Sequence, residues 1–159
     1  MTKTEIIQIL AGFGGTIGFA VLFNIRGRRL ALAALGGLLS WFLYVVLGNF
    51  IENEVINYFL VSFAVSIYAE IMARVIKTPT TTFITTALIP LIPGGSLYYT
   101  MANAFSGNME SFLQKGIYTL ELASALALGI IVSTTITQIF YKIISPNPYH
   151  YNDCSLSKR

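Results

Sequence analysis

The first candidate functional residues are Glu70 and Glu121, two carboxylates that lie inside long apolar stretches. An ionised carboxylate in an apolar medium is costly, so by default it faces protein or water. Arg74 follows Glu70 at the four-residue spacing of a helical ion pair. Glu70 therefore fits either a structural pair with Arg74 or a proton-coupling group. Glu121 fits either a hydrated carboxylate near a helix end or a second proton-coupling group.

A second candidate for chemistry is the segment Ile89–Gly95, which reads Ile-Pro-Leu-Ile-Pro-Gly-Gly. A proline has no amide hydrogen and clashes with the preceding turn of a helix. Two prolines three residues apart, followed by two glycines, predict an unwound stretch. A continuous helix with a proline kink is the alternative. A new half-helix beginning near Gly95 or Ser96 would present free amides and a partial positive charge, which together suit a carboxylate.

Other reactive residue types are scarce in this sequence. Its one histidine, one aspartate and one cysteine are His150, Asp153 and Cys154, close together near the C-terminal end. No metal site, disulfide or cofactor is therefore expected, and an enzyme is disfavoured. Tyr98, Tyr99 and Tyr118 fit either the lining of a path or an aromatic belt at a membrane surface.

The composition indicates an integral membrane protein made of helices. Of 159 residues, 55% are hydrophobic and 11% are charged, against roughly 25% charged residues in soluble domains. This excludes a soluble domain and a disordered chain, and it disfavours nucleic-acid binding. Continuous apolar runs favour helices over a membrane barrel, which needs alternation. Five transmembrane helices are expected over residues 6–24, 30–48, 55–76, 81–101 and 116–141, the fourth broken at mid-membrane.

The basic residues predict how the five spans are oriented. Lys and Arg mark the cytoplasmic side of a membrane protein. Eight of the ten fall after the first, third or fifth span, namely Arg26, Arg28, Arg29, Arg74, Lys77, Lys142, Lys158 and Arg159. Only Lys3 and Lys115 fall on the other side. The N-terminus is therefore expected outside and the C-terminus inside, with residues 1–144 as the membrane domain and 145–159 as a disordered cytoplasmic tail.

Small residues at helical spacing indicate close packing between helices. They occur as Gly14 and Gly18 in the first span, Gly36 and Ser40 in the second, and Ala125, Gly129 and Ser133 in the fifth. The third span carries a polar stripe that should face the bundle or a partner: Ser62, Ser66, Glu70, Arg74 and Lys77. A compact bundle or an oligomer is expected.

Two segments resemble a known family, the ThrE-type threonine/serine exporters. Residues 18–24, Gly-Phe-Ala-Val-Leu-Phe-Asn, resemble the motif that ends that family's first helix. The more distinctive likeness is in the fourth span, where Ile89-Pro90-Leu91-Ile92-Pro93-Gly94 is accompanied by Pro79, Phe83, Ser96, Tyr98 and Met101. The likeness covers about Thr16 to Tyr141 and is to the C-terminal, five-helix half, which is often a separate small protein.

The resemblance implies a multi-pass protein of the cell membrane that exports small amino acids such as threonine and serine, or a dicarboxylate such as succinate in two-subunit relatives. Export in this family is thought to be driven by the proton gradient. The expected partners are the lipid bilayer, a small carboxylated substrate, and a second membrane subunit with the missing half or further copies of the chain. An accessory subunit that does not itself transport is the alternative. The candidate substrate-binding residues are Pro90, Pro93, Gly94, Gly95, Ser96, Tyr98 and Asn24, and the candidate proton-coupling residues are Glu70 and Glu121.

Overall fold

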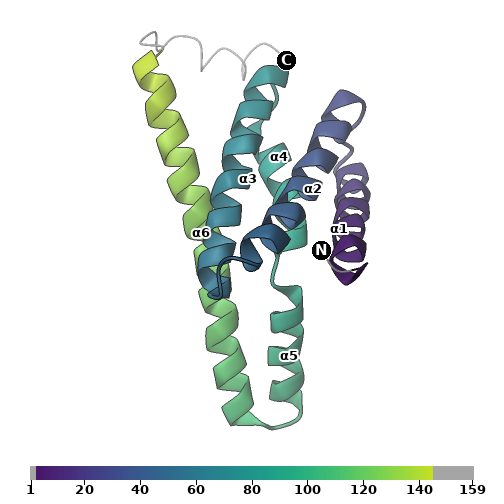
Figure 1. Ribbon diagram of the computed structural model, residues 1–159, viewed down its shortest axis with the longest axis vertical. Coiled ribbons are helices and arrows are strands. Elements are labelled where there is room, and N and C mark those ends of the chain that lie inside the picture. The colour runs from purple at the N-terminus through teal and green to yellow at the C-terminus, as the bar shows by residue number, and fades with distance from the viewer. Residues whose placement is uncertain (1–2, 145–159) are drawn as a thin grey trace, which may run out of the picture.

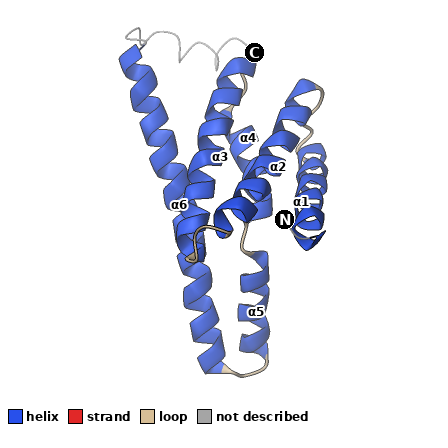
Figure 2. Cartoon of the chain, viewed as in Figure 1, coloured by secondary structure: helices blue, strands red, loops and turns tan. Residues whose placement is uncertain are grey.

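The computed structural model describes residues 3–144, and the expected tail 145–159 lies outside the described residues. The described residues form helices joined by short turns, with no strand among them (Figure 2). In chain order these helices are α1 (Lys3–Leu22), α2 (Arg28–Gly48), α3 (Glu54–Ile76), α4 (Thr80–Leu88), the short 3₁₀ helix η1 (Ile89–Leu91), α5 (Gly94–Phe105) and α6 (Met109–Ile144). The expected all-helical architecture is confirmed.

Three of the helices are long and apolar enough to cross a membrane: α2, α3 and α6 over Met109–Ile143. Two shorter apolar stretches, Ile6–Leu22 and Thr80–Leu91, correspond to the first span and to the first part of the fourth. At 1.5 Å per residue, Thr80–Leu91 would be ~18 Å long as a helix, which is about half of a membrane crossing.

The successive spans run up and down (Figure 1), so that Arg26, Arg28, Arg29, Arg74, Lys77 and Lys142 gather at one end of the bundle, whereas Lys115 lies toward the other. Arg26 lies between α1 and α2, Arg28 and Arg29 begin α2, and Arg74 and Lys77 lie at the end of α3. The apolar core is divided along the bundle into two clusters. The cluster at the basic end contains Ala20, Ile25, Ala33, Ala69, Ala73 and Phe83. The other contains Tyr58, Val61, Val65, Ala87, Leu88, Leu91, Leu122 and Ala125.

Close helix contacts are made by some of the small residues and not by others. A methyl group at Gly37 would overlap the Thr16 side chain of α1, and one at Gly129 would overlap the Ser62 hydroxyl of α3. Gly14 and Gly18, by contrast, have open space around them. The pair Gly14–Gly18 therefore does not pack against the described part of the chain, because α1 turns its Thr16 face toward α2.

The connection between the expected fourth and fifth spans, residues 102–115, is mostly helical. α5 continues to Phe105, and α6 already begins at Met109. Gly107, with φ of 74°, makes the turn, and the Asn108 side chain accepts a hydrogen bond from the Ser111 amide at 3.2 Å. This N-cap starts α6 before its apolar run begins. The result is a hairpin of α5 and the first part of α6, which projects beyond the other helices (Figure 1).

Candidate functional site

The fourth span is interrupted between α4 and α5, as predicted from its prolines. α4 ends at Leu88, and η1 continues for only three residues. Ile92 is then extended, with φ −60° and ψ 126°, before α5 begins at Gly94. Neither Pro90 nor Pro93 can donate the amide hydrogen bond that would carry an α-helix through this stretch. Leu91 is fully buried in the core, so the interruption is held in place by packing.

The N-terminus of α5 presents unpaired amides at this interruption. Pro93 occupies the N-cap position, and no side chain caps the helix. The Gly94 amide donates to the Ile92 carbonyl at 2.6 Å and the Leu97 amide to the Pro93 carbonyl at 3.1 Å. Gly95 and Ser96 lie between them, and their amides have no backbone acceptor among the described residues. Gly95 is exposed and Ser96 is partly exposed, so this helix start is not covered by the described chain.

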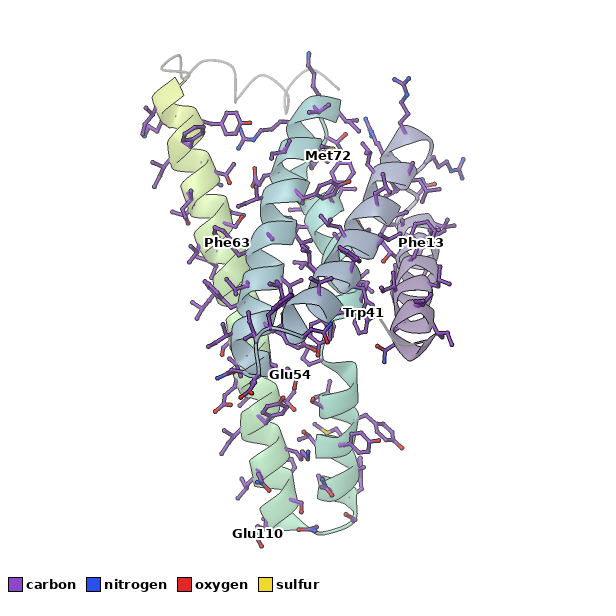
Figure 3. The ribbon with its side chains drawn as sticks, in the orientation of Figure 1. Phe13, Trp41, Glu54, Phe63, Met72 and Glu110 are labelled. Carbon is purple, nitrogen blue, oxygen red and sulfur yellow. The ribbon has the colours of Figure 1, made fainter. Side chains whose placement is uncertain are left out.

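A cavity of about 270 Å³ lies beside the interruption, between α1, α2 and η1. Its lining is mainly apolar and consists of Gln8, Ala11, Gly12, Gly15, Trp41, Ile89 and Pro90. The Trp41 indole nitrogen is buried and has no hydrogen-bond partner among the described residues. Figure 3 places Trp41 on the side of α2 that faces α1. Because an indole N–H can only donate, this unpaired group fits an acceptor such as a carboxylate oxygen.

Glu70 is 4% exposed and forms the ion pair expected with Arg74. The distance between the Glu70 Oε2 and an Arg74 guanidinium nitrogen is 3.0 Å. Arg74 also lies over the ring of Tyr141 from α6, 3.6 Å from its centre. The polar stripe of α3 therefore faces α6, with Glu70 the only acidic side chain in it.

Two serine hydroxyls in the same contact are buried without a partner. Ser66, one turn before Glu70 on α3, and Ser133 on α6 are both 0% exposed. The hydroxyl of each lacks a hydrogen-bond partner among the described residues. Buried hydroxyls are normally satisfied by protein or water. This seam between α3 and α6 consequently offers unfilled hydrogen-bonding positions along the approach to Glu70.

The remaining candidate residues are not brought together with the interruption. Asn24 is exposed, with φ of 56°, in the turn after α1. It is twelve residues from Gly12, which is ~18 Å along a helix from the cavity beside Pro90. Glu121 is exposed on α6. Tyr98 is 69% exposed on α5 and stacks edge-on with Tyr99, so it points away from the 270 Å³ cavity.

Two features of the site were missed by reasoning from the sequence. Trp41 was not recognised as a donor, since an indole becomes informative only when it is buried and unpaired. Glu54, placed at the start of α3 near the level where α5 begins (Figure 3), accepts hydrogen bonds from two tyrosines of other helices. One is Tyr44 of α2, at 2.8 Å, and the other is Tyr118 of α6. The available sequence signal was that Tyr44 and Tyr118, like Glu54, lie near the ends of expected spans.

Comparison with known proteins gives one family. The family model described as Threonine/Serine exporter, ThrE, matches residues 8–136. This range includes α2 to α5 entirely and most of α1 and α6. No curated protein and no solved structure matches the chain.

Proposed function

Because the chain belongs to the threonine/serine exporter (ThrE) family, a family of multi-pass membrane exporters, we propose that it forms part of a secondary transporter for small carboxylated metabolites. Amino acids of the threonine and serine type, or a dicarboxylate such as succinate, are the proposed substrates. The broken fourth helix is proposed to hold the carboxylate, and the proton gradient to drive its export.

The observation that carries this proposal is the set of unpaired donors around the interruption. The amides of Gly95 and Ser96 have no backbone acceptor, and the Trp41 N–H has no partner. A helix N-terminus also carries a partial positive charge that attracts anions. Interrupted helices that present their termini to a substrate near the bilayer midplane recur in secondary transporters. No Lys or Arg lies within residues 78–114, so backbone and indole donors are the available carboxylate-binding groups in this region.

Glu70 is proposed as the residue that carries the coupling proton. It is buried, and the seam beside it has two unpaired hydroxyls, Ser66 and Ser133, where water can bind. A chain of hydroxyls and water leading to a buried carboxylate is a usual route for protons in membrane proteins. Glu121 remains a second candidate, although its exposure on this chain makes it a weaker one.

The transporting unit is proposed to contain a second membrane subunit or a second copy of this chain. The amides of the proposed carboxylate site open outward, and the glycine face of α1 at Gly14 and Gly18 has nothing packed on it. In lipid, polar groups such as these amides must be covered by protein or water. We further propose five membrane passes, with the N-terminus outside, because most of the basic residues of the described chain gather at one end of the bundle.

An accessory role, in which the chain stabilises a partner carrier without binding substrate, is the competing proposal. The two are separated by restoring the helix with the double substitution Pro93→Ala and Gly94→Leu. Export of radiolabelled threonine, serine and succinate from loaded cells is measured at matched membrane abundance. Pro79→Ala with Ala102→Leu is the control, since it replaces a proline with alanine and a small residue with leucine outside the interruption.

We expect the Pro93→Ala, Gly94→Leu protein to export its substrate at least about tenfold more slowly. The control should export it at the rate of the unmodified protein. Abundance and co-purification with any partner should persist. Export equal to that of the unmodified protein would mean that the interruption does not hold the substrate, and would favour the accessory role.

A further inference from the structure

A second cavity, of about 350 Å³, lies at the end of the bundle opposite the basic residues. It is formed where α2 ends and α3 begins, and its lining residues are Tyr44, Val45, Gly48, Ile51, Glu52, Glu54 and Asn57. None of these seven residues is basic. Within the described part of the chain, no Lys or Arg forms an ion pair with either of the two glutamates. The cavity therefore carries an uncompensated negative charge.

Glu54 is held in this cavity with acceptor capacity to spare. Tyr44 donates to its Oε1 at 2.8 Å, and Tyr118 donates to its Oε2. Each carboxylate oxygen can accept a second hydrogen bond. The two tyrosines come from different helices, α2 and α6, so they fix the position of the carboxylate without neutralising it.

Asn57 supplies an independent sign that a donor is missing. It is 3% exposed, and its Nδ2 donates to the Tyr44 carbonyl at 3.1 Å. Its Oδ1 is buried and has no partner among the described residues. A methyl group at Gly48 would lie 3.3 Å from the Asn57 amide nitrogen, so Asn57 packs against α2 where that helix has no side chain. A buried amide oxygen without a donor is uncommon and calls for a ligand or water.

The end of α2 adds a further negative charge to the wall of the cavity. α2 finishes at Gly48, in the wall of the cavity, and a helix C-terminus carries a partial negative charge. Two carboxylates, an amide oxygen and a helix C-terminus thus converge on one space. All of them favour a cation that donates several hydrogen bonds.

We propose that this cavity binds the primary ammonium group of a small amino compound. An ammonium group has three donors, which match the free positions on Glu54 and the Asn57 Oδ1. The cavity is large for a bare metal ion, and its lining includes the Tyr44 side chain and the aliphatic side chains Val45 and Ile51, which suit the body of an organic molecule. This inference rests on the proposed function only for the identity of the compound, an amino acid on its way through the transporter.

The chain contains its own reporter for this cavity. Trp41 is the single tryptophan, and its ring centre lies 5.2 Å from that of Tyr44. Filling the cavity changes the surroundings of Tyr44 and should therefore shift the fluorescence of Trp41. Binding can be followed in this way without any measurement of transport.

The experiment titrates the full chain, in nanodiscs of phosphatidylcholine and phosphatidylglycerol, with L-threoninamide, which has an ammonium group and no carboxylate. Butyrate and succinate serve as carboxylates without an ammonium group, and NaCl and KCl as inorganic cations. A fluorescence change caused by butyrate or succinate at the carboxylate site beside Trp41 should be the same in Glu54→Gln as in the unmodified protein. Threoninamide should give a saturable fluorescence change. Glu54→Gln, which keeps the side-chain shape and an acceptor for one tyrosine, should weaken its binding roughly tenfold or more, because a hydrogen bond to a charged group is replaced by a neutral one.

Glu52 lines the cavity without a described hydrogen bond, so Glu52→Gln should weaken threoninamide binding by a smaller factor. Glu110→Gln, an exposed carboxylate at the far end of the hairpin (Figure 3), should leave it unchanged. The elution volume and emission maximum of each variant report its folding; if Glu54→Gln misfolds, the comparison of Glu52→Gln with Glu110→Gln decides. Three results would overturn the proposal. They are no binding of threoninamide to the unmodified protein, an equal response to Na⁺ or K⁺, or undiminished binding in Glu54→Gln and Glu52→Gln.

One further arm distinguishes a soluble amine from a lipid headgroup, since phosphatidylethanolamine carries the same ammonium chemistry. Threoninamide is titrated again in nanodiscs that contain phosphatidylethanolamine. Unchanged affinity supports a site for a soluble amino compound, and loss of the response would assign the cavity to the lipid. Because these titrations need no export, they remain decisive even if the carboxylate site at the interruption fails its own test.

Discussion

Arg74 lies over the ring of Tyr141, with its guanidinium carbon 3.6 Å from the ring centre. Earlier in the same two helices, Ser62 of α3 touches Gly129 of α6. From Ser62 to Arg74 and from Gly129 to Tyr141 the chain advances by the same twelve residues. The two helices are thus parallel and in constant register. At intermediate turns, this register sets Ser66 level with Ser133 and Glu70 level with Thr137.

Gly129→Ala should destabilise the protein because the contact with α3 has no room for a side chain. Besides the Ser62 hydroxyl, the added carbon would lie 2.7 Å from the Phe59 carbonyl oxygen. A cost of about 1–3 kcal/mol is typical for such overpacking. Thermal unfolding in detergent should show a lower midpoint than that of Gly14→Ala, where nothing lies within 4 Å of the added carbon. Equal midpoints would contradict the close contact.

Glu70→Gln should abolish the response of export to an imposed pH gradient while leaving downhill export by substrate gradient in place. The reason is that glutamine cannot take up and release a proton. Arg74→Gln is the informative companion, since it breaks the same ion pair but keeps the carboxylate. If both variants respond to the gradient equally, Glu70 is a structural partner of Arg74 and not the proton carrier. The measurement is substrate efflux from proteoliposomes with and without the pH gradient.

Trp41→Phe should raise the KM for carboxylated substrates while changing kcat less. The phenyl ring fills most of the indole volume but removes the buried N–H donor beside Pro90. Loss of one hydrogen bond to a charged group is worth ~1.5–3 kcal/mol, which is roughly 10- to 100-fold in affinity. Phe42→Leu, at the exposed neighbouring position, is the control. An unchanged KM would mean that the indole N–H does not touch the substrate.

The proposed orientation predicts opposite labelling of the two ends of the bundle. In a Cys154→Ser background, Arg26→Cys and Glu52→Cys each place one exposed thiol at one end. A membrane-impermeant maleimide added to intact cells should label position 52 and should label position 26 only after the membrane is opened. The reverse pattern would invert the orientation.

Local chemistry made the interrupted helix predictable, and tertiary contacts made other features unpredictable. Pro90 and Pro93 lack an amide hydrogen wherever the segment lies in the fold, so the start of α5 was predicted to within one or two residues. The ion pair of Glu70 with Arg74 was foreseen for the same reason, since both residues lie on adjacent turns of one helix.

α6 begins before the span expected at residues 116–141, because an apolar run marks the lipid-facing part of a helix and not the whole helix. The signal for its true start is the N-cap Asn108, followed by Glu110 in the first turn. The Glu54 network was beyond reach for a different reason. Tyr118 lies 64 positions from Glu54 along the chain, and only the packing of α3 against α6 brings them together. Likewise, the spacing of Gly14 and Gly18 predicted a close helix contact, but it did not indicate which surface would make that contact.

The length of α6 has a consequence for how the protein sits in lipid. Its 36 residues extend over ~54 Å, whereas the hydrocarbon layer is ~30 Å thick. To fit wholly inside, the helix would have to tilt by about 56°, well beyond the usual range of up to 40°. Part of α6 must therefore emerge from the hydrocarbon, and its first turns, paired with α5, are the part that already projects.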